Sequence, residues 1–225
     1  MSERFFIPLV GDNYRGGIGR NKYRVLVLGA SLYCDHDGKH KRKGKRIERC
    51  PHFNVCTSGD IKDSSAFNDR CPFSGDTKLE DDLKNESSST MTRFADKMKE
   101  RFGNLFDGDS IGIHIAFSEY VQYFLNHQMT SSDDLSDRDF DAFIETLDDL
   151  HPNVVIVWGG VVADTLRESR YAIKADDGEP WDFAWEYGGM FIWFICCTHP
   201  ASGGHFYKDF PSFSKRFEDT INYEK

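Results

Sequence analysis

Four short runs of apolar and β-branched residues, well separated along the 225-residue chain, constrain its fold more than any other feature. They span residues 23–28, 110–117, 153–158 and 190–198. Each run is typical of a strand buried on both faces, because apolar residues follow one another without the polar alternation of a half-exposed strand. We expect the four runs to pair as one buried parallel sheet.

Segments with helical periodicity lie between and after these runs. Apolar residues recur at helical spacing over residues 90–102, 139–150, 161–167 and 210–223. Strands that alternate with helices predict a three-layer α/β/α sandwich around a four-stranded parallel sheet. The expected organisation is a single α/β domain over residues 1–225.

The composition places the chain among globular proteins of the cytoplasm. Hydrophobic residues make up 39% of the sequence, which is enough for a substantial core. The amino-terminal segment is broken by Pro8 and Gly11 and lacks the apolar core of a signal peptide. No run of about 18 apolar residues appears. We therefore expect a cytoplasmic monomer that does not enter a membrane.

Charge is distributed unevenly. The formal net charge is −9, which argues against a protein that coats duplex DNA, since phosphate neutralisation requires a broad basic surface. Residues 39–49 nevertheless contain seven of the 28 Lys and Arg residues. This basic run is either a phosphate-contacting element or a solvated loop.

A segment at about 34–86 departs from the α/β pattern, because it is rich in charged residues, Ser, Gly and Cys and has little periodicity. Four of the six cysteines of the chain lie in it: Cys34, Cys50, Cys56 and Cys71. A metal held by these thiolates, or by three of them with a histidine, would brace an insertion that has few other means of folding. We expect structural zinc first and an iron–sulfur cluster second, with reduced thiols as the alternative.

Two motifs follow predicted strands at the edge where a parallel sheet binds ligands. Gly29-Ala30-Ser31-Leu32-Tyr33 follows the first strand, and His199-Pro200-Ala201-Ser202 follows the fourth. The first motif predicts a tight turn that exposes backbone N–H groups and the Ser31 side chain. Each motif alone is a weak indication of a site, and the significance lies in their pairing.

Together the two motifs resemble the signature motifs of the uracil-DNA glycosylase superfamily. Gly29 and Tyr33 match the first motif, and His199 and Pro200 match the second. Similarity to a bacterial branch of the superfamily extends over residues 6–11, 115–122 and 152–159, and thus covers most of the chain outside the cysteine-rich insertion.

The resemblance implies a glycosylase that hydrolyses the N-glycosidic bond of uracil or another damaged base in DNA. It implies that His199 contacts the uracil O2 atom while negative charge develops there, and that Ser31 lies where an attacking water is positioned. It further implies that the partner is DNA, single-stranded or with a flipped base, and that catalysis requires no cofactor. The residues expected to bind the substrate are Gly29, Ala30, Tyr33, Phe117, Glu119 and Ser202.

The departures from the superfamily pattern leave alternatives open. Ser31 replaces the acidic or amide residue of many branches, and a hydroxyl is too weak a base to activate water unaided. The second strand lacks the Asn that reads the uracil amide edge, so either His114 or Glu119 takes a polar role, or the pocket binds something other than uracil. Otherwise His114 is a buried structural residue and Glu119 caps a helix. The second hypothesis is therefore a binding module that has lost hydrolysis, and a third is an interaction protein with a metal-braced loop.

Overall fold

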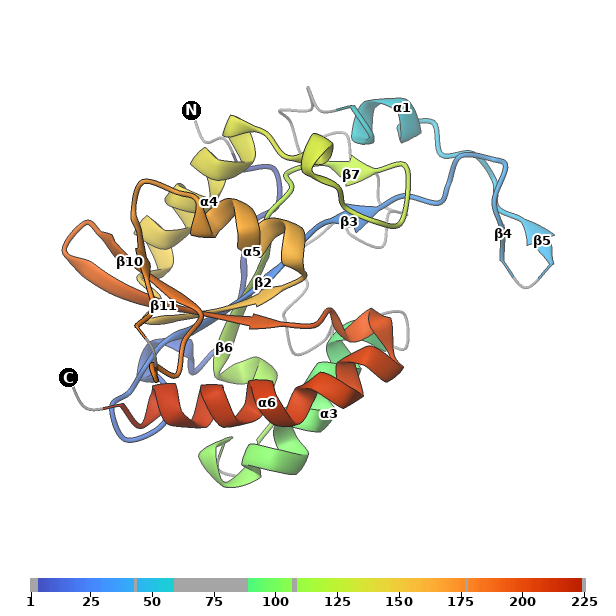
Figure 1. Ribbon diagram of the computed structural model, residues 1–225. Helices are drawn as coiled ribbons and strands as arrows, with labels where there is room; N and C mark the ends of the chain where they lie inside the picture. Colours follow the sequence, from blue (N-terminus) through green and yellow to red (C-terminus); the bar gives the residue numbers. More distant parts are fainter. Residues whose placement is uncertain (1–3, 43, 59–88, 107–108, 177, 224–225) are drawn as a thin grey trace.

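The computed structural model describes residues 4–42, 44–58, 89–106, 109–176 and 178–223. At its centre is a seven-stranded mixed sheet with the strand order β1-β6-β2-β8-β11-β10-β9 (Figure 1). The strands, in that order, span Leu9–Val10, Ile115–Glu119, Val25–Gly29, Val154–Trp158, Met190–Cys197, Phe183–Tyr187 and Ala172–Lys174.

Four adjacent strands form a parallel core within this sheet. β2 pairs in parallel with β6 on one side and β8 on the other, and β8 pairs in parallel with β11. β2 and β8 are buried over their whole length, as their unbroken apolar sequences predict. The prediction that the four apolar runs share one parallel sheet is confirmed.

The expectation of a sheet with only four strands is wrong, because three antiparallel strands extend the parallel core. β1 pairs with β6 at one edge, and β10 and β9 follow β11 at the other. β10 and β11 form a hairpin whose turn residues, Gly188 and Gly189, have positive φ angles of 57° and 77°. Two consecutive glycines between strands favour such a tight turn, so this hairpin had a signal in the sequence.

The second predicted strand begins later than expected. Residues Ile111–Ile113 form a 3₁₀ helix, η4, rather than the start of a strand. Ser110 caps this turn by accepting a hydrogen bond from the Gly112 N–H at 3.3 Å. The serine hydroxyl thus binds the Gly112 N–H, which in a strand would pair with a neighbouring strand. β6 starts only at Ile115.

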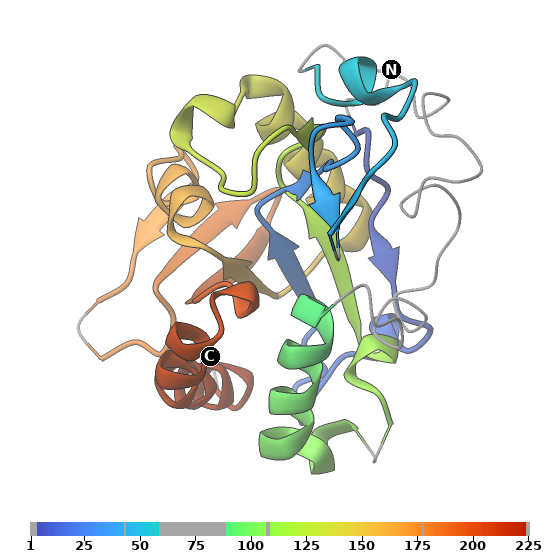
Figure 2. The same cartoon turned by 90° about the vertical axis from the view of Figure 1, so that its right-hand side faces the viewer.

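Helices cover both faces of the sheet (Figure 2). α3 (Ser89–Phe102) and α6 (Gly204–Ile221) pack on one face, and α4 (Asp137–Leu150) and α5 (Gly160–Arg167) on the other. All four predicted helices are present, and each starts earlier than its periodicity indicated. Among the described helices, none is long and apolar enough to span a bilayer.

The alternation of side chains along each strand separates two cores. Val25 and Val27 pack with α3 and α6, whereas Leu26 and Leu28 pack with α4 and α5. A capping box at Ser136 fixes the start of α4, because the Ser136 hydroxyl and the Asp139 carboxylate each bind the other residue's backbone N–H. The central strands are therefore held from both sides.

Shorter elements complete the chain. Their bounds are η1 Tyr14–Gly16, β3 Leu32–Tyr33, β4 Lys41–Arg42, β5 Lys45–Arg46, α1 Phe53–Cys56, η3 Gly103–Phe106, β7 Phe124–Leu125, η5 Ser132–Asp134 and η6 Pro200–Ser202. Of these, η1 and η3 lie at the amino end of β6, and the others lie around the carboxyl edge of the sheet. β3 pairs in parallel with β7, and β4 pairs with β5 as a small antiparallel hairpin. A third apolar cluster, centred on Phe5, Cys56 and Phe124, joins α1 to this region.

Candidate functional site at the carboxyl edge

The carboxyl ends of the four parallel strands bring the two sequence motifs to one edge of the sheet. Gly29 ends β2, Glu119 ends β6, Trp158 ends β8, and His199 lies two residues after β11. The side chains of Val27, Phe117 and Cys197 pack toward α3 and α6, and Gly29, Glu119 and His199 each lie two positions after one of them; Trp158 itself packs on that side. Because side chains alternate along strands, these positions belong to the same face of the sheet. The prediction that Gly29 and His199 share an edge is confirmed.

The Glu119 carboxyl group lies directly on Gly29. The two residues are register partners in neighbouring parallel strands. A Cβ atom at position 29 would be 2.7 Å from the Glu119 Cδ atom and 2.9 Å from Oε1, and closer still to Oε2. Real Cβ atoms do not approach so closely, so glycine is needed here to admit the carboxyl group rather than to permit an unusual backbone angle.

The environment of Glu119 favours the neutral acid. The residue is 9% exposed, and Oε2 is fully buried with no hydrogen-bond partner among the described residues. Burial raises the pKa of Glu119 from an ordinary 4.5 to about 8, because removal from water disfavours the charged form. Glu119 is the last residue of β6 and no helix begins there, so the alternative that it caps a helix is wrong.

His199 is arranged as a neutral hydrogen-bond donor. Its Nδ1 atom accepts a hydrogen bond from the Ala201 backbone N–H at 3.2 Å. An acceptor nitrogen carries no proton, so the proton of the neutral ring is on Nε2. Burial lowers the pKa of His199, which keeps the ring neutral at pH 7. The backbone of the second motif therefore fixes the tautomer of its own histidine.

Aromatic rings connect His199 to β6. The rings of His199 and Trp158 meet edge to face with centroids 5.7 Å apart, and the Trp158 and Phe117 centroids are 5.5 Å apart. Trp158 also packs edge to face against Phe94 of α3, at 5.1 Å. Phe117 is half-buried, and its predicted place near the site agrees with this cluster. Trp158 and Phe94 were not among the expected site residues, because each is an ordinary core residue in the sequence pattern.

Ser31 has a partner that no local pattern indicates. Its hydroxyl lies 2.6 Å from the hydroxyl of Thr130, a residue 99 positions away in the loop after β7. The first motif is also tied to the segment after β6, because Tyr120 N–H donates to the Gly29 carbonyl and Val121 N–H donates to the Ala30 carbonyl. The loop conformation is thus fixed around Ser31.

A buried glutamine holds the segment that follows β6. The Gln122 side-chain amide donates to the Glu119 carbonyl at 2.8 Å, and its Oε1 accepts the N–H groups of Phe5 and Phe6 at 2.7 and 2.9 Å. Its backbone N–H donates to Asp139. Gln122 therefore positions the backbone of Glu119 from behind, a role that a lone glutamine in the sequence did not indicate.

His114 lies at the opposite end of β6 from the candidate site. It caps η4, packs against Phe106 and has Asp109 at 3.9 Å. Glu119 lies five positions further along the strand, or about 16 Å away. The alternative that His114 takes a pocket role is therefore wrong, and its role is structural.

Two other predicted residues are exposed. Tyr33, in β3, is 42% exposed. Ser202 is exposed and its backbone N–H donates to the His199 carbonyl at 2.9 Å. Neither side chain has a described contact with Glu119 or His199, so their roles in binding stay predictions. Arg93 of α3, which was not expected at the site, donates to the Pro200 carbonyl at 3.3 Å and braces the second motif.

Three of the four predicted metal ligands lie in the described part of the chain, and Cys71 lies outside it. The Cys34 sulfur is 4.0 Å from Nδ1 of His36, the Cys50 N–H donates to the His36 carbonyl, and Cys56 is buried. Within the described ranges, no three His, Cys, Asp or Glu side chains are grouped as a metal site. The four-thiolate site accordingly stays a prediction.

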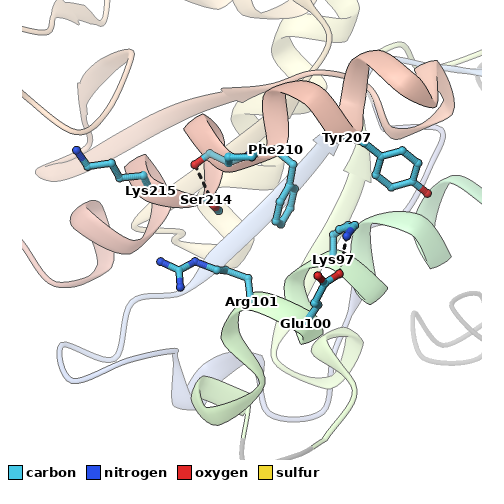
Figure 3. Close-up of a pocket in the computed structure, with 8 residues that line it drawn as sticks. Lys97, Glu100, Arg101, Tyr207, Phe210, Ser214 and Lys215 are labelled. Carbon is cyan, nitrogen blue, oxygen red and sulfur yellow. Dashed lines mark hydrogen bonds and ion pairs between the residues drawn. The ribbon is translucent and has the colours of Figure 1, made fainter.

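A groove of about 840 Å³ lies between α3 and α6, away from the carboxyl edge (Figure 3). Three of its four charged residues form ion pairs within the protein. Lys97 pairs with Glu100 and lies over the Tyr207 ring, and Arg101 pairs with Glu218. Lys215 also lines the groove, where it is exposed and has no described ion-pair partner, but a single lysine does not define a site. The candidate site therefore remains the carboxyl edge.

Comparisons with known proteins do not assign the chain to a family. A scan against protein-family models finds no match, and a search of curated proteins finds no similar sequence. The functional argument therefore depends on the residues at the carboxyl edge.

Proposed function

We propose that this chain is a uracil-DNA glycosylase-like enzyme that releases uracil or another damaged base from DNA, and that its α/β/α sandwich is a variant of that superfamily's fold. One observation carries the proposal. A neutral histidine with its proton on Nε2 and a buried carboxyl group occupy the same face of one sheet edge, at His199 and Glu119. These two groups supply the hydrogen bonds that a departing pyrimidine requires.

His199 stabilises the leaving base. In the hydrolysis, the bond between the sugar C1′ and the base nitrogen breaks, its electron pair stays on the base, and a water oxygen bonds to C1′. A proton from that water balances the charge of the base. Negative charge collects on O2 of the base before the proton arrives, and a fixed Nε2–H donor lowers the energy of that state.

Glu119 reads the pairing edge of the base. A neutral carboxyl group offers one donor and one acceptor, as the side-chain amide of asparagine does. The amide edge of uracil likewise presents one donor, N3–H, and one acceptor, O4. Glu119 thus supplies in its neutral form the function that the superfamily assigns to an Asn on the second strand. An ionised Glu119 would offer acceptors alone and would repel O4.

Ser31 and Thr130 orient the attacking water. The two hydroxyls form one hydrogen-bonded pair beside Gly29, and a hydroxyl can align water without removing its proton. This is sufficient if the bond to the base is largely broken before water attacks, since the positively charged sugar then needs only a weak nucleophile. Phe117 lines the site through its contact with Trp158.

A second candidate function is binding without hydrolysis. The observation that favours it is the absence of an ionised base beside Ser31, whose described partner is another hydroxyl. Such a protein would retain the base-reading group Glu119 and would recognise a nucleotide or a flipped base.

The test is release of base from a single-stranded oligonucleotide that carries uracil, with hypoxanthine as a second substrate. We expect His199→Ala to lower the rate on the order of 100-fold, the typical loss for one preorganised donor. His205→Ala is the matched control, because His205 is exposed and lies six residues further on. Ser31→Ala should cost less than His199→Ala.

The outcomes separate the two functions. No release from either substrate, combined with binding of the uracil oligonucleotide that is lost in Glu119→Ala, supports the binding module and overturns the enzyme. Release that is equally fast in His199→Ala and in the wild type overturns the assigned role of His199.

A further inference from the structure

The β4–β5 hairpin is a strongly basic element on an acidic protein. The chain carries a net charge of −9, yet seven of its 28 Lys and Arg residues lie between residues 39 and 49. Lys41, Lys45 and Arg46 are exposed, and none of them forms an ion pair with a described carboxylate. The basic groups are therefore available for an external anion.

The pairing register of the hairpin opposes like charges. Lys41 is the direct cross-strand partner of Arg46, and Lys45 is the partner of Arg42. Like charges at directly opposite positions destabilise a strand pair, and a two-stranded hairpin is already marginal by itself. A polyanion laid against the hairpin would remove this repulsion, so the sequence is better suited to the bound state than to the free protein.

Hydrogen bonds nonetheless stabilise the base of the hairpin. The Asp37 carboxylate accepts the N–H groups of Lys39 and His40 at 2.6 and 2.8 Å and lies 3.0 Å from the His40 ring. The Ile47 N–H donates to the His40 carbonyl, and the Cys50 N–H donates to the His36 carbonyl. These bonds extend the backbone pairing beyond the ends of β4 and β5. The basic tip is therefore presented by a braced stem.

The hairpin projects from the edge that carries the candidate site. It begins at Lys41, a short segment after β3, which ends the first motif. Figure 1 shows it extending from the body of the protein on the side to which β11 runs. A ligand bound at Gly29 and His199 would thus leave its flanking chain on the hairpin side. The basic residues would then lie beside the part of the ligand that flanks the site.

We propose that the β4–β5 hairpin binds the phosphate backbone of the DNA strand that flanks the base, and this inference rests on the proposed function. A nucleic acid suits the hairpin better than a membrane, because between residues 38 and 49 the only apolar residue is Ile47, which is half-buried. Insertion into a bilayer requires an apolar face that this segment lacks. In this arrangement the hairpin contacts a few phosphates of the strand.

The test compares two triple variants of the full chain. The hairpin variant is Lys41→Gln, Lys45→Gln and Arg46→Gln; the control, Lys99→Gln, Arg170→Gln and Lys174→Gln, removes the same charge from exposed positions elsewhere. Fluorescence anisotropy measures binding to labelled single-stranded oligonucleotides, with and without uracil, between 50 and 200 mM salt (roughly the range over which phosphate contacts weaken). Thermal melting verifies folding, and relief of the like-charge pair should leave the hairpin variant at least as stable as the wild type.

We expect the hairpin variant to lose on the order of 100-fold in affinity at 0.1 M salt, with a salt slope reduced by about 2, because each phosphate contact to a single strand contributes about 0.7. The loss should be the same with and without uracil, and the control should match the wild type. Equal slopes in all three proteins overturn the proposal, as does hairpin-dependent binding to phosphatidylserine vesicles without binding to DNA. A normal hairpin effect in a protein that releases no base overturns the enzyme and leaves this inference standing.

Discussion

The Glu119 carboxyl group rests on the Cα atom of Gly29, its register partner in the neighbouring parallel strand, so that a Cβ atom at position 29 would lie 2.7 Å from Cδ of Glu119. This contact joins the first motif to the end of β6. It also explains why a carboxyl group can be buried there, since only the missing side chain of glycine leaves room for it.

Substitution Gly29→Ala should expel the Glu119 carboxyl group from its buried position. The methyl group would overlap both Cδ and Oε1, and the flexible Glu119 side chain can turn toward water. We expect the pKa of Glu119 to fall toward its ordinary range, measured by NMR titration with carbon-labelled glutamate. Gly16→Ala is the control, because a Cβ atom there meets nothing within 4 Å. A Glu119 pKa unchanged by Gly29→Ala would contradict the contact.

Substitution Glu119→Gln should stabilise the protein at neutral pH but not in acid. The folded-state pKa of about 8 exceeds the ordinary 4.5, so the folded state binds more protons between these values. The free energy of unfolding of the wild type therefore falls as pH rises from 4.5 to 8. Glutamine does not ionise, so the variant should gain roughly 3 kcal/mol at pH 7 relative to pH 4. Urea unfolding at several pH values measures this difference.

The control for that experiment is Glu186→Gln, since Glu186 is exposed in β10. Parallel pH profiles for the wild type and Glu119→Gln would show that Glu119 is not held neutral. The same variant also tests the role in base reading, because an amide keeps one donor and one acceptor. Base binding by the wild type should weaken above pH 8, where Glu119 ionises. Binding by Glu119→Gln should survive and should not weaken in this range.

His199 should carry its proton on Nε2 at pH 7. The Ala201 N–H occupies Nδ1, and burial lowers the pKa of the ring, so the neutral form persists to below 6.5. Nitrogen NMR of labelled histidine distinguishes the two tautomers, and His199→Ala identifies the signal. The folded state binds fewer protons at His199 than the unfolded state, so this residue should reduce stability as pH falls below 6.5. A proton on Nδ1 would exclude Nε2–H as the donor.

The cysteine-rich segment should retain a metal in the purified protein. Elemental analysis of protein purified without added metal is expected to find zinc, or iron if a cluster is present. In the zinc form, the thiolate sulfurs should lie about 2.3 Å from the metal. Cys50→Ser should lower the metal content, while Cys197→Ser should not, because Cys197 belongs to the buried core beside the sheet. Metal-free protein with four readily titrated thiols in residues 34–71 would end this prediction.

The sequence by itself determined the parallel core of the fold. The apolar runs that became β2, β6, β8 and β11 identify buried strands, because a strand covered on both faces leaves no position for polar alternation. The order of strands and helices then places Gly29 and His199 at one edge. Because the burial of a strand follows from its run of apolar residues, it can be predicted from the sequence alone.

Only the tertiary structure decided which polar groups meet at that edge. The contacts of Glu119 with Gly29 and of Ser31 with Thr130 join segments 90 and 99 residues apart. No local pattern encodes such pairs, because they depend on strand order and on loop paths that the whole core fixes. The same holds for ionisation. The sequence supplies a glutamate and a histidine, and the packing around them removes the water that would otherwise keep each pKa at its ordinary value.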